Sequence, residues 1–123
     1  MEIKENTLPK LLRRVANQYP NIPAQYSKNK EGKFQEILYK ELYEIAKNFG
    51  AGLIDLGIKR GDHIGLISDN RKEWFQADMG LMAIGAIDVP RGCDATEHDL
   101  RYILSFAECK TVIAENSNQI KKI

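Results

Sequence analysis

The chain has 123 residues, of which 43% are hydrophobic and 28% are charged, and these values fit one globular domain with a single core. Lysine and arginine number 18 against 17 acidic residues, so the formal net charge is +1. Proteins that bind nucleic acid usually carry a clustered basic excess, and this near balance excludes nucleic acid as an expected partner. No apolar run approaches the about 18 residues of a membrane span, so no transmembrane segment is expected.

The two cysteines do not suggest a metal or redox site. Cys93 and Cys109 lack the C-x-x-C spacing, and no pair of histidines lies near them, which favours two reduced thiols. The N-terminus has no apolar run of the kind found in a signal peptide. These features predict a cytoplasmic protein.

Residues 1–38 are expected to form a helix followed by a β-hairpin. Thr7 can cap a helix that ends near Tyr19, because Pro20 follows. Residues 22–27 and 33–38 are typical of short strands, and the polar segment between them predicts a turn.

The clearest helix is predicted over residues 39–56, where apolar residues recur at offsets of three, four and seven. Gly50 and Gly52 lower the helix propensity of this segment, so we expect them to permit close packing. Gly57 suits the left-handed conformation that often ends a helix.

Strands and helices alternate after this helix. Asn70 and Glu73 resemble a capping box at the start of a buried helix, and Thr96 with Asp99 indicates another helix start. Pro90 is expected to end a short strand. The predicted elements are a strand at 63–68, a helix at 71–85, a strand at 86–89, a helix from 96, a strand at 111–114 and a further helix capped by Asn116 or Ser117.

Such alternation predicts an α/β fold with parallel strand pairing and right-handed crossovers. We therefore expect a partial doubly wound, mainly parallel sheet with helices on both faces, preceded by the N-terminal helix and hairpin. The whole of 1–123 is expected to be a single domain, with the helix and hairpin in 1–38 and the βαβ-type region in 39–123. The last residues look like the opening turn of a helix, which predicts that the chain is the N-terminal fragment of a longer protein.

The sequence lacks the usual motifs of nucleotide and hydrolase sites. No P-loop, Gly-x-Ser-x-Gly elbow or His-Glu-x-x-His motif occurs. Gly50 and Gly52 begin like a dinucleotide fingerprint, but Asp55 stands where the third glycine is needed, and the segment lies within a predicted helix.

A few single residues are weaker candidates. Asp78 interrupts an apolar helix, which fits a functional carboxylate or, more simply, an exposed helix edge or a local hydrogen bond. Trp74 and Phe75 fit a ligand pocket or, more simply, the core. His63 and His98 have no neighbouring nucleophile or ligand cluster and are expected to be structural or surface residues.

Arg91 is the residue of most interest. It follows a predicted strand at the carboxyl edge of the sheet, where open α/β sheets bind ligands, and a guanidinium there can meet a phosphate or carboxylate. An ion pair with Asp94 or Glu97 is the simpler explanation of its position.

Three ordered stretches carry a resemblance to a known family. They are residues 42–64, which include Gly57-Ile58-Lys59-Arg60-Gly61-Asp62; Ser68-Asp69-Asn70-Arg71-Lys72-Glu73-Trp74; and Gly85-Ala86-Ile87-Asp88-Val89-Pro90-Arg91-Gly92 with residues 100–104. Over about residues 7–116 the chain resembles the adenylate-forming, AMP-binding enzymes, and within them the long-chain fatty acyl-CoA synthetases, or fatty acid–CoA ligases.

The resemblance implies a role in fatty acid metabolism. Such a parent enzyme uses ATP and Mg²⁺ to convert an acid to an acyl-adenylate, then transfers the acyl group to coenzyme A. Its phosphate loop, metal-binding glutamate, ribose-binding aspartate and lid lysine lie further along the family's chains. None maps onto these 123 residues, so no catalytic, cofactor-binding or metal-binding residue is assigned and the fragment is expected to be inactive alone.

Several alternatives stay open. The chain fits a self-contained small α/β binding or regulatory domain, another acid–thiol ligase, or an amino-acid adenylation domain. The expected partners are the rest of the parent polypeptide and, for the parent, fatty acid, ATP and coenzyme A. Self-association through an uncovered apolar edge or face of the sheet is expected. A peripheral association of the parent enzyme with membranes is left open.

Overall fold

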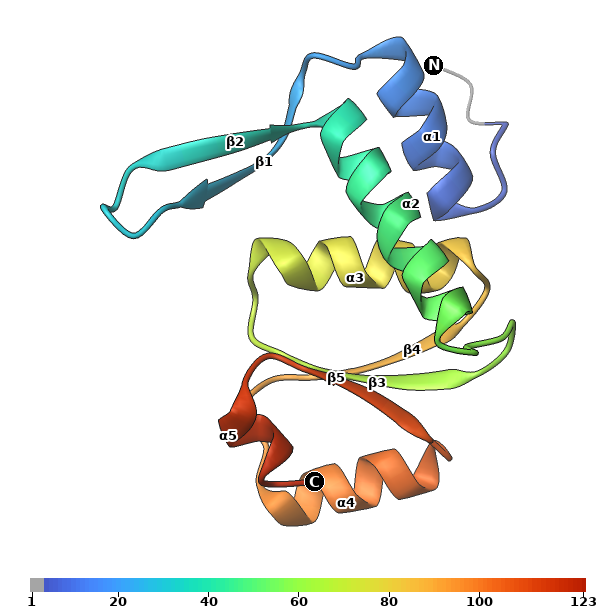
Figure 1. Ribbon diagram of the computed structural model, residues 1–123, viewed down its shortest axis with the longest axis vertical. Helices are drawn as coiled ribbons and strands as arrows, with labels where there is room; N and C mark the ends of the chain where they lie inside the picture. Colours follow the sequence, from blue (N-terminus) through green and yellow to red (C-terminus); the bar gives the residue numbers. More distant parts are fainter. Residues whose placement is uncertain (1–3) are drawn as a thin grey trace.

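The computed structural model describes residues 4–123 and has an α/β architecture (Figure 1). An N-terminal helix and an antiparallel hairpin precede a three-stranded parallel sheet, as the sequence predicts. The elements are α1 (Leu8–Gln18), β1 (Pro23–Lys28), β2 (Phe34–Leu38), α2 (Tyr39–Asp55), β3 (His63–Ile67), α3 (Lys72–Ala83), β4 (Ile87–Arg91), α4 (Glu97–Phe106), β5 (Thr111–Ala114) and α5 (Ser117–Ile120).

Local sequence signals account for several element boundaries. The Thr7 side chain caps α1, and Thr96 and Asp99 form the capping box of α4. Gly57 has φ +92° just after the end of α2, as its left-handed role requires. Asn116, one of the two expected caps, accepts hydrogen bonds at the start of α5.

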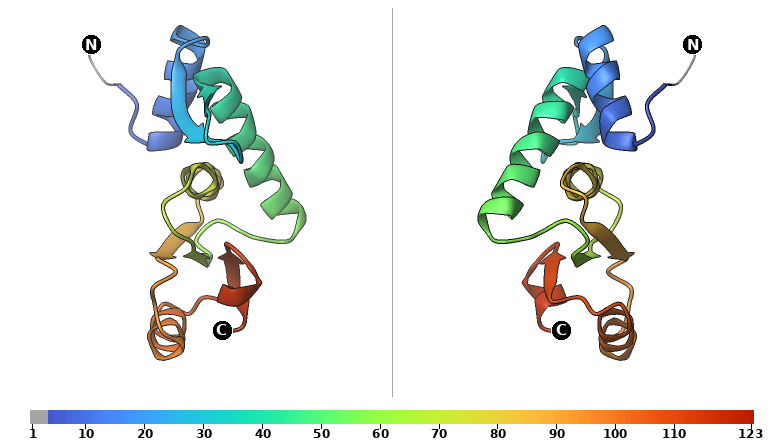
Figure 2. Two further views of the ribbon diagram at one scale, coloured as in Figure 1. Left: turned by 90° about the vertical axis from the view of Figure 1, so that its left-hand side faces the viewer. Right: turned by 90° about the vertical axis from the view of Figure 1, so that its right-hand side faces the viewer.

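The sheet has the strand order β4-β3-β5, with β3 parallel to both neighbours. The side chains of β3 alternate between its two faces, so Ile64 packs with Leu53 and Leu81 under α2 and α3. Ile67 packs with Leu100 and Leu104 of α4 on the other face. Figures 1 and 2 show the resulting layers, with α3 on one side of the sheet and α4 on the other.

A further core lies between α1, α2 and α3, on the side of α3 that faces away from the parallel sheet. Leu12, Leu42, Ala46 and Met79 are buried together there. α2 and α3 approach closely at Gly50, where a Cβ would lie only 3.0 Å from the backbone oxygen of Gly80. The close-packing prediction is therefore confirmed for Gly50. It is wrong for Gly52, which has nothing within 4 Å of a built Cβ and lies exposed.

Two boundary predictions are also wrong. Pro90 does not end its strand but lies within β4. β4 is an edge strand. The backbone groups of Ile87 and Arg91 bond toward β3 and the residues beside it. Pro90 alternates with these residues, so its missing N–H faces outward, away from the sheet. Asn70 does not cap α3; Arg71 is the N-cap residue and its side chain bonds Glu73 instead.

Candidate functional site

The carboxyl ends of the three parallel strands meet at one edge of the sheet. Ile67 pairs with Arg91 on one side and Ala114 on the other, so the residues that follow all three strands come together. Ligands of open α/β sheets bind at this kind of edge. We call the polar group formed here by Ser68, Asp69, Arg71, Cys93 and Glu115 the strand-end cluster.

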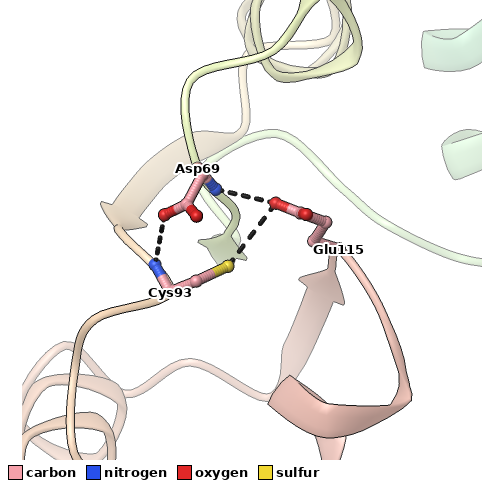
Figure 3. A group of neighbouring side chains, drawn as sticks. All are labelled: Asp69, Cys93 and Glu115. Atoms are coloured by element: carbon pink, nitrogen blue, oxygen red, sulfur yellow. Dashed lines mark hydrogen bonds between the residues drawn. The ribbon is translucent and has the colours of Figure 1, made fainter.

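Glu115 is the centre of the strand-end cluster (Figure 3). Its Oε2 atom accepts hydrogen bonds from the backbone N–H of Asp69 at 2.9 Å, the hydroxyl of Ser68 at 3.1 Å and the thiol of Cys93 at 3.5 Å. The carboxylate of Asp69 accepts the backbone N–H of Cys93 at 2.9 Å. The loops after β3, β4 and β5 are thereby tied to one another.

The charges of the cluster follow from these contacts. The N–H of Asp69 and then the side chains of Cys93 and Ser68 hold the pKa of Glu115 below its usual value, and nearby Arg71 acts in the same direction. Burial and the hydrogen bond to Glu115 raise the pKa of the Cys93 thiol. Cys93 is therefore protonated at neutral pH and is a poor nucleophile.

Asp69, Cys93 and Glu115 are also the residues with which the cluster could hold a metal, since their ligand atoms lie within 4.8 Å of one another. A thiolate and two carboxylates suit Zn²⁺. However, the thiol holds its proton, one oxygen of Glu115 already accepts three donors, and Nη1 of Arg71 lies 3.5 Å from the other. These contacts explain the strand-end cluster as a set of structural hydrogen bonds that hold the three strand ends together.

Arg91 lies where the sequence predicts, as the last residue of β4 at this edge. Its guanidinium forms an ion pair with the carboxylate of Asp94 at 3.0 Å. This contact agrees with the simpler expectation, an ion pair with Asp94 or Glu97. Arg71 was missed by the sequence reasoning, although it too lies at the edge and contacts Glu73 and Glu115. Its only sequence signal is its place between the end of a strand and the start of a helix.

The other single candidates do not join this cluster. His63 bonds the backbone oxygen of Ala107 through Nδ1, and His98 is exposed on α4. Asp78 is hydrogen-bonded to the carboxyl group of Asp88, which favours the local-contact interpretation of its position. Cys109 also lies outside the cluster, and like the cluster residue Cys93 it is a free thiol, as expected.

An apolar pocket of about 300 Å³ adjoins the strand-end cluster. Trp74 lines it together with Phe49 and Ile113, whereas Phe75 does not line it and is 38% exposed. Arg71 and Glu115 belong to both the pocket wall and the cluster. The pocket and the cluster form a continuous region with an apolar floor and charged side chains.

The sequence model of the family described as AMP-binding enzyme matches residues 12–123. The chain belongs to the AMP-binding enzyme family. All residues of the strand-end cluster and of the adjoining pocket lie within the matched segment, so this edge is part of the region that the chain shares with the family.

Curated relatives in this family include fatty acid-activating enzymes. Fatty acyl-CoA synthetase A of Dictyostelium discoideum is 32% identical over 94 residues, which cover 76% of this chain and 14% of that protein. Long-chain-fatty-acid--CoA ligase ACSBG2 of Xenopus laevis is 28% identical over 117 residues, which cover 95% of this chain and 16% of that protein. The chain thus spans only a small part of the length of these relatives.

Solved structures share the fold of this chain. The N-terminal domain of FACL13 from Mycobacterium tuberculosis has a TM-score of 0.80 and 26% identity, covering 92% of this chain and 28% of that one. The N-terminal subdomain of NpsA from Klebsiella oxytoca has a TM-score of 0.81 over 89% of this chain and 26% of that one; at 23% identity it supports the fold alone.

Proposed function

We propose that the chain is the N-terminal scaffold part of an ATP-dependent long-chain fatty acid–CoA ligase. The observation that carries the proposal is the similarity to fatty acyl-CoA synthetase A and ACSBG2, the latter over 95% of the chain. The parent reaction would join a fatty acid to AMP with release of pyrophosphate, and then transfer the acyl group to the thiol of coenzyme A.

The proposed role of these residues is structural. The hydroxyl of Ser68 and the N–H of Asp69 are donors of a kind that binds phosphate, but the carboxylate of Glu115 already accepts both. The strand-end cluster therefore offers no free cradle for ATP. Binding of ATP and Mg²⁺ is assigned to parts of the parent that this chain does not contain.

The first test measures the chain alone. Incubation with ATP, Mg²⁺, a long-chain fatty acid and coenzyme A is expected to produce neither AMP nor acyl-CoA above the level without protein. Turnover by the purified chain would contradict the scaffold role.

The second test is a chimera in which this chain replaces the aligned segment of ACSBG2. We expect the folded chimera to retain fatty acid-dependent exchange of pyrophosphate into ATP. The matched control carries Gly65→Leu in the same segment, since even a Cβ at Gly65 would lie 2.6 Å from Leu104. A chimera that folds but shows no exchange would overturn the assignment to this kind of ligase.

A second candidate concerns the acyl acceptor. Long-chain-fatty-acid--[acyl-carrier-protein] ligase AEE15 of Arabidopsis thaliana is 32% identical over 88 residues, covering 72% of this chain and 12% of that protein. A parent that transfers the acyl group to a carrier protein would contain the same scaffold. Supplying the parent with coenzyme A and, separately, with an acyl carrier protein distinguishes the two acceptors.

A further inference from the structure

A second pocket lies among α1, α2 and α3, away from the strand-end cluster. It has a volume of about 380 Å³, within the range of small-molecule sites. None of its lining residues belongs to the strands or to the cluster. We call it the three-helix pocket.

The floor of the three-helix pocket is apolar. Leu12, Ala46 and Met79 contribute buried side chains from the three helices, and Ile54 adds a side chain that is 57% exposed. Gly50 lies in the floor, where α2 approaches α3 closely. An apolar group placed here would remove exposed hydrocarbon from water.

The charged residues around this floor have one sign. Lys10, Arg13 and Lys47 line the pocket, and no acidic side chain does so among residues 4–123. Lys47 bonds Glu44 and Lys10 bonds Asn6, but within the described part of the chain Arg13 has no carboxylate partner. The pocket therefore offers positive charge beside an apolar surface.

The first turn of α1 adds to this potential. Pro9 and Lys10 line the pocket within that turn, which contains no acidic residue. The N-terminus of a helix carries a partial positive charge. Glu5 lines a neighbouring pocket with Lys10 and Arg13, but its carboxylate is paired with Arg14 at 2.7 Å. One end of the pocket thus combines a helix N-terminus with Lys10 and Arg13.

We propose that the three-helix pocket binds a small amphiphilic anion, with a single apolar tail on the floor and the anionic head group near Lys10, Arg13 and the first turn of α1. The concave floor suits one tail, whereas a membrane surface would require a broad convex face. This inference does not depend on the proposed ligase function.

Octyl phosphate below its micellar concentration is the probe. Titration of the full chain, followed by calorimetry and by amide chemical shifts, is expected to give saturable binding that perturbs residues of α1, α2 and α3. Octanol and inorganic phosphate, which each lack one half of the ligand, should bind roughly tenfold more weakly or worse. Equal binding of octanol or of phosphate would overturn the proposal.

Variants separate the two halves of the site. Ala51 is exposed and lines the pocket, so Ala51→Trp should fill the space and abolish binding without disturbing the core. Ala83→Trp, at another exposed lining position, provides a second blocking variant if the first fails to fold. Undiminished binding by a folded blocking variant would contradict the site.

Arg13→Gln should weaken octyl phosphate binding and leave octanol binding unchanged. The matched control is Lys30→Gln, which removes one exposed positive charge from the hairpin turn; equal losses in both variants would show a general charge effect and reject the site. Vesicles of anionic and neutral phospholipid complete the test. Binding to anionic vesicles in the absence of binding to monomeric octyl phosphate would replace this proposal with a membrane surface.

Discussion

The carboxyl groups of Asp78 on α3 and Asp88 on β4 share a hydrogen bond. Burial, followed by the charge and hydrogen bond of Asp78, raises the pKa of Asp88 to about 7. Oδ1 of Asp88 is buried and has no hydrogen-bond partner in the described part of the chain. Burial raises the pKa of the Cys109 thiol, and the charge of Asp88 raises it further. The pair therefore holds a proton that isolated aspartates would release.

This proton should make stability depend on pH in a definite direction. The folded state holds the proton up to about pH 7, whereas the ordinary value for aspartate is 3.8, so the folded state binds more protons between these limits. The contribution of Asp88 to the free energy of unfolding is thus complete below about pH 4, and it is lost as the pH rises through 7. We expect a loss on the order of 2 kcal/mol, less than the full shift implies because the site is only half-buried.

Denaturant titrations across this interval measure the effect. Asp88→Asn, which stays neutral and can still donate to Asp78, should remove most of the decline. The control Asp55→Asn changes an exposed aspartate on α2 and should retain it. A decline of the same size in Asp88→Asn would show that another group is responsible.

Glu115 is the second residue whose loss has a specific prediction. Glu115→Ala leaves the N–H of Asp69 and the thiol of Cys93 without this acceptor, and the hydroxyl of Ser68 keeps only the backbone oxygen of Asp69, so the denaturation midpoint should fall. The pKa of the Cys93 thiol should fall as well, because the hydrogen bond and charge of Glu115 both raise it. Iodoacetamide should then alkylate Cys93 faster in a Cys109→Ala background. Glu36→Ala, at an exposed position of β2, is the control and should change neither the denaturation midpoint nor the alkylation rate. An unchanged alkylation rate in Glu115→Ala would contradict the proposed role of Glu115 in the strand-end cluster.

At the scale of elements, the crossing of α2 and α3 depends on two glycines in contact. A Cβ on Gly80 would lie 2.7 Å from Cδ1 of Phe49 and 3.0 Å from the backbone oxygen of Ala46. Gly80→Ala should therefore destabilise the protein by about 1–3 kcal/mol, despite the better helix propensity of alanine.

Gly52→Ala is the matched control, because Gly52 is also helical but has nothing within 4 Å of a built Cβ. That variant should be more stable than the parent by up to roughly 1 kcal/mol. Unfolding midpoints of the two variants, measured side by side, test the packing directly. Destabilisation of similar size by both variants would show that the helix crossing is not the cause.

These glycines also show how far the sequence could predict the elements. Helices with local caps, such as α1 and α4, are predictable because Thr7 and Thr96 lie within three residues of the groups they bond. Helical spacing places Gly50 on the buried stripe of α2 with Ala46 and Leu53 and leaves Gly52 off that stripe, but the contact that excludes a Cβ at Gly50 comes from α3. The effect of Pro90 likewise depends on a distant segment, since it is set by which strand lies beside β4.

The strand-end cluster was less predictable still. Its central hydrogen bond joins Asp69 to Glu115, which are 46 residues apart in the chain. The sequence predicts that strand ends meet at one edge, and so it correctly places Arg91 at that edge. It does not predict that Glu115, and not Arg91, organises the edge, because that depends on side-chain directions in three separate loops.

At the scale of the whole molecule, no helix within residues 4–123 combines the length and apolar character needed to cross a bilayer. The sheet has two edge strands of different kinds. On β4, Pro90 faces outward and cannot donate a backbone hydrogen bond. On β5, the N–H of Glu115 bonds inward to Ile67, so alternation turns the backbone groups of Val112 and Ala114 outward. The edge at β5 is therefore the open one.

Self-association of the chain should accordingly occur through β5. We expect sedimentation velocity to show weak, concentration-dependent dimers, because an open edge offers unpaired donors and acceptors to a second copy. Ala114→Pro should shift the chain toward monomers, since it removes an outward N–H and leaves the ladder to β3 in place. Ala114→Ser keeps that N–H and is the control. A parent chain that stays strictly monomeric at high concentration, or dimers that persist in a folded Ala114→Pro variant, would show that β5 is not the associating edge.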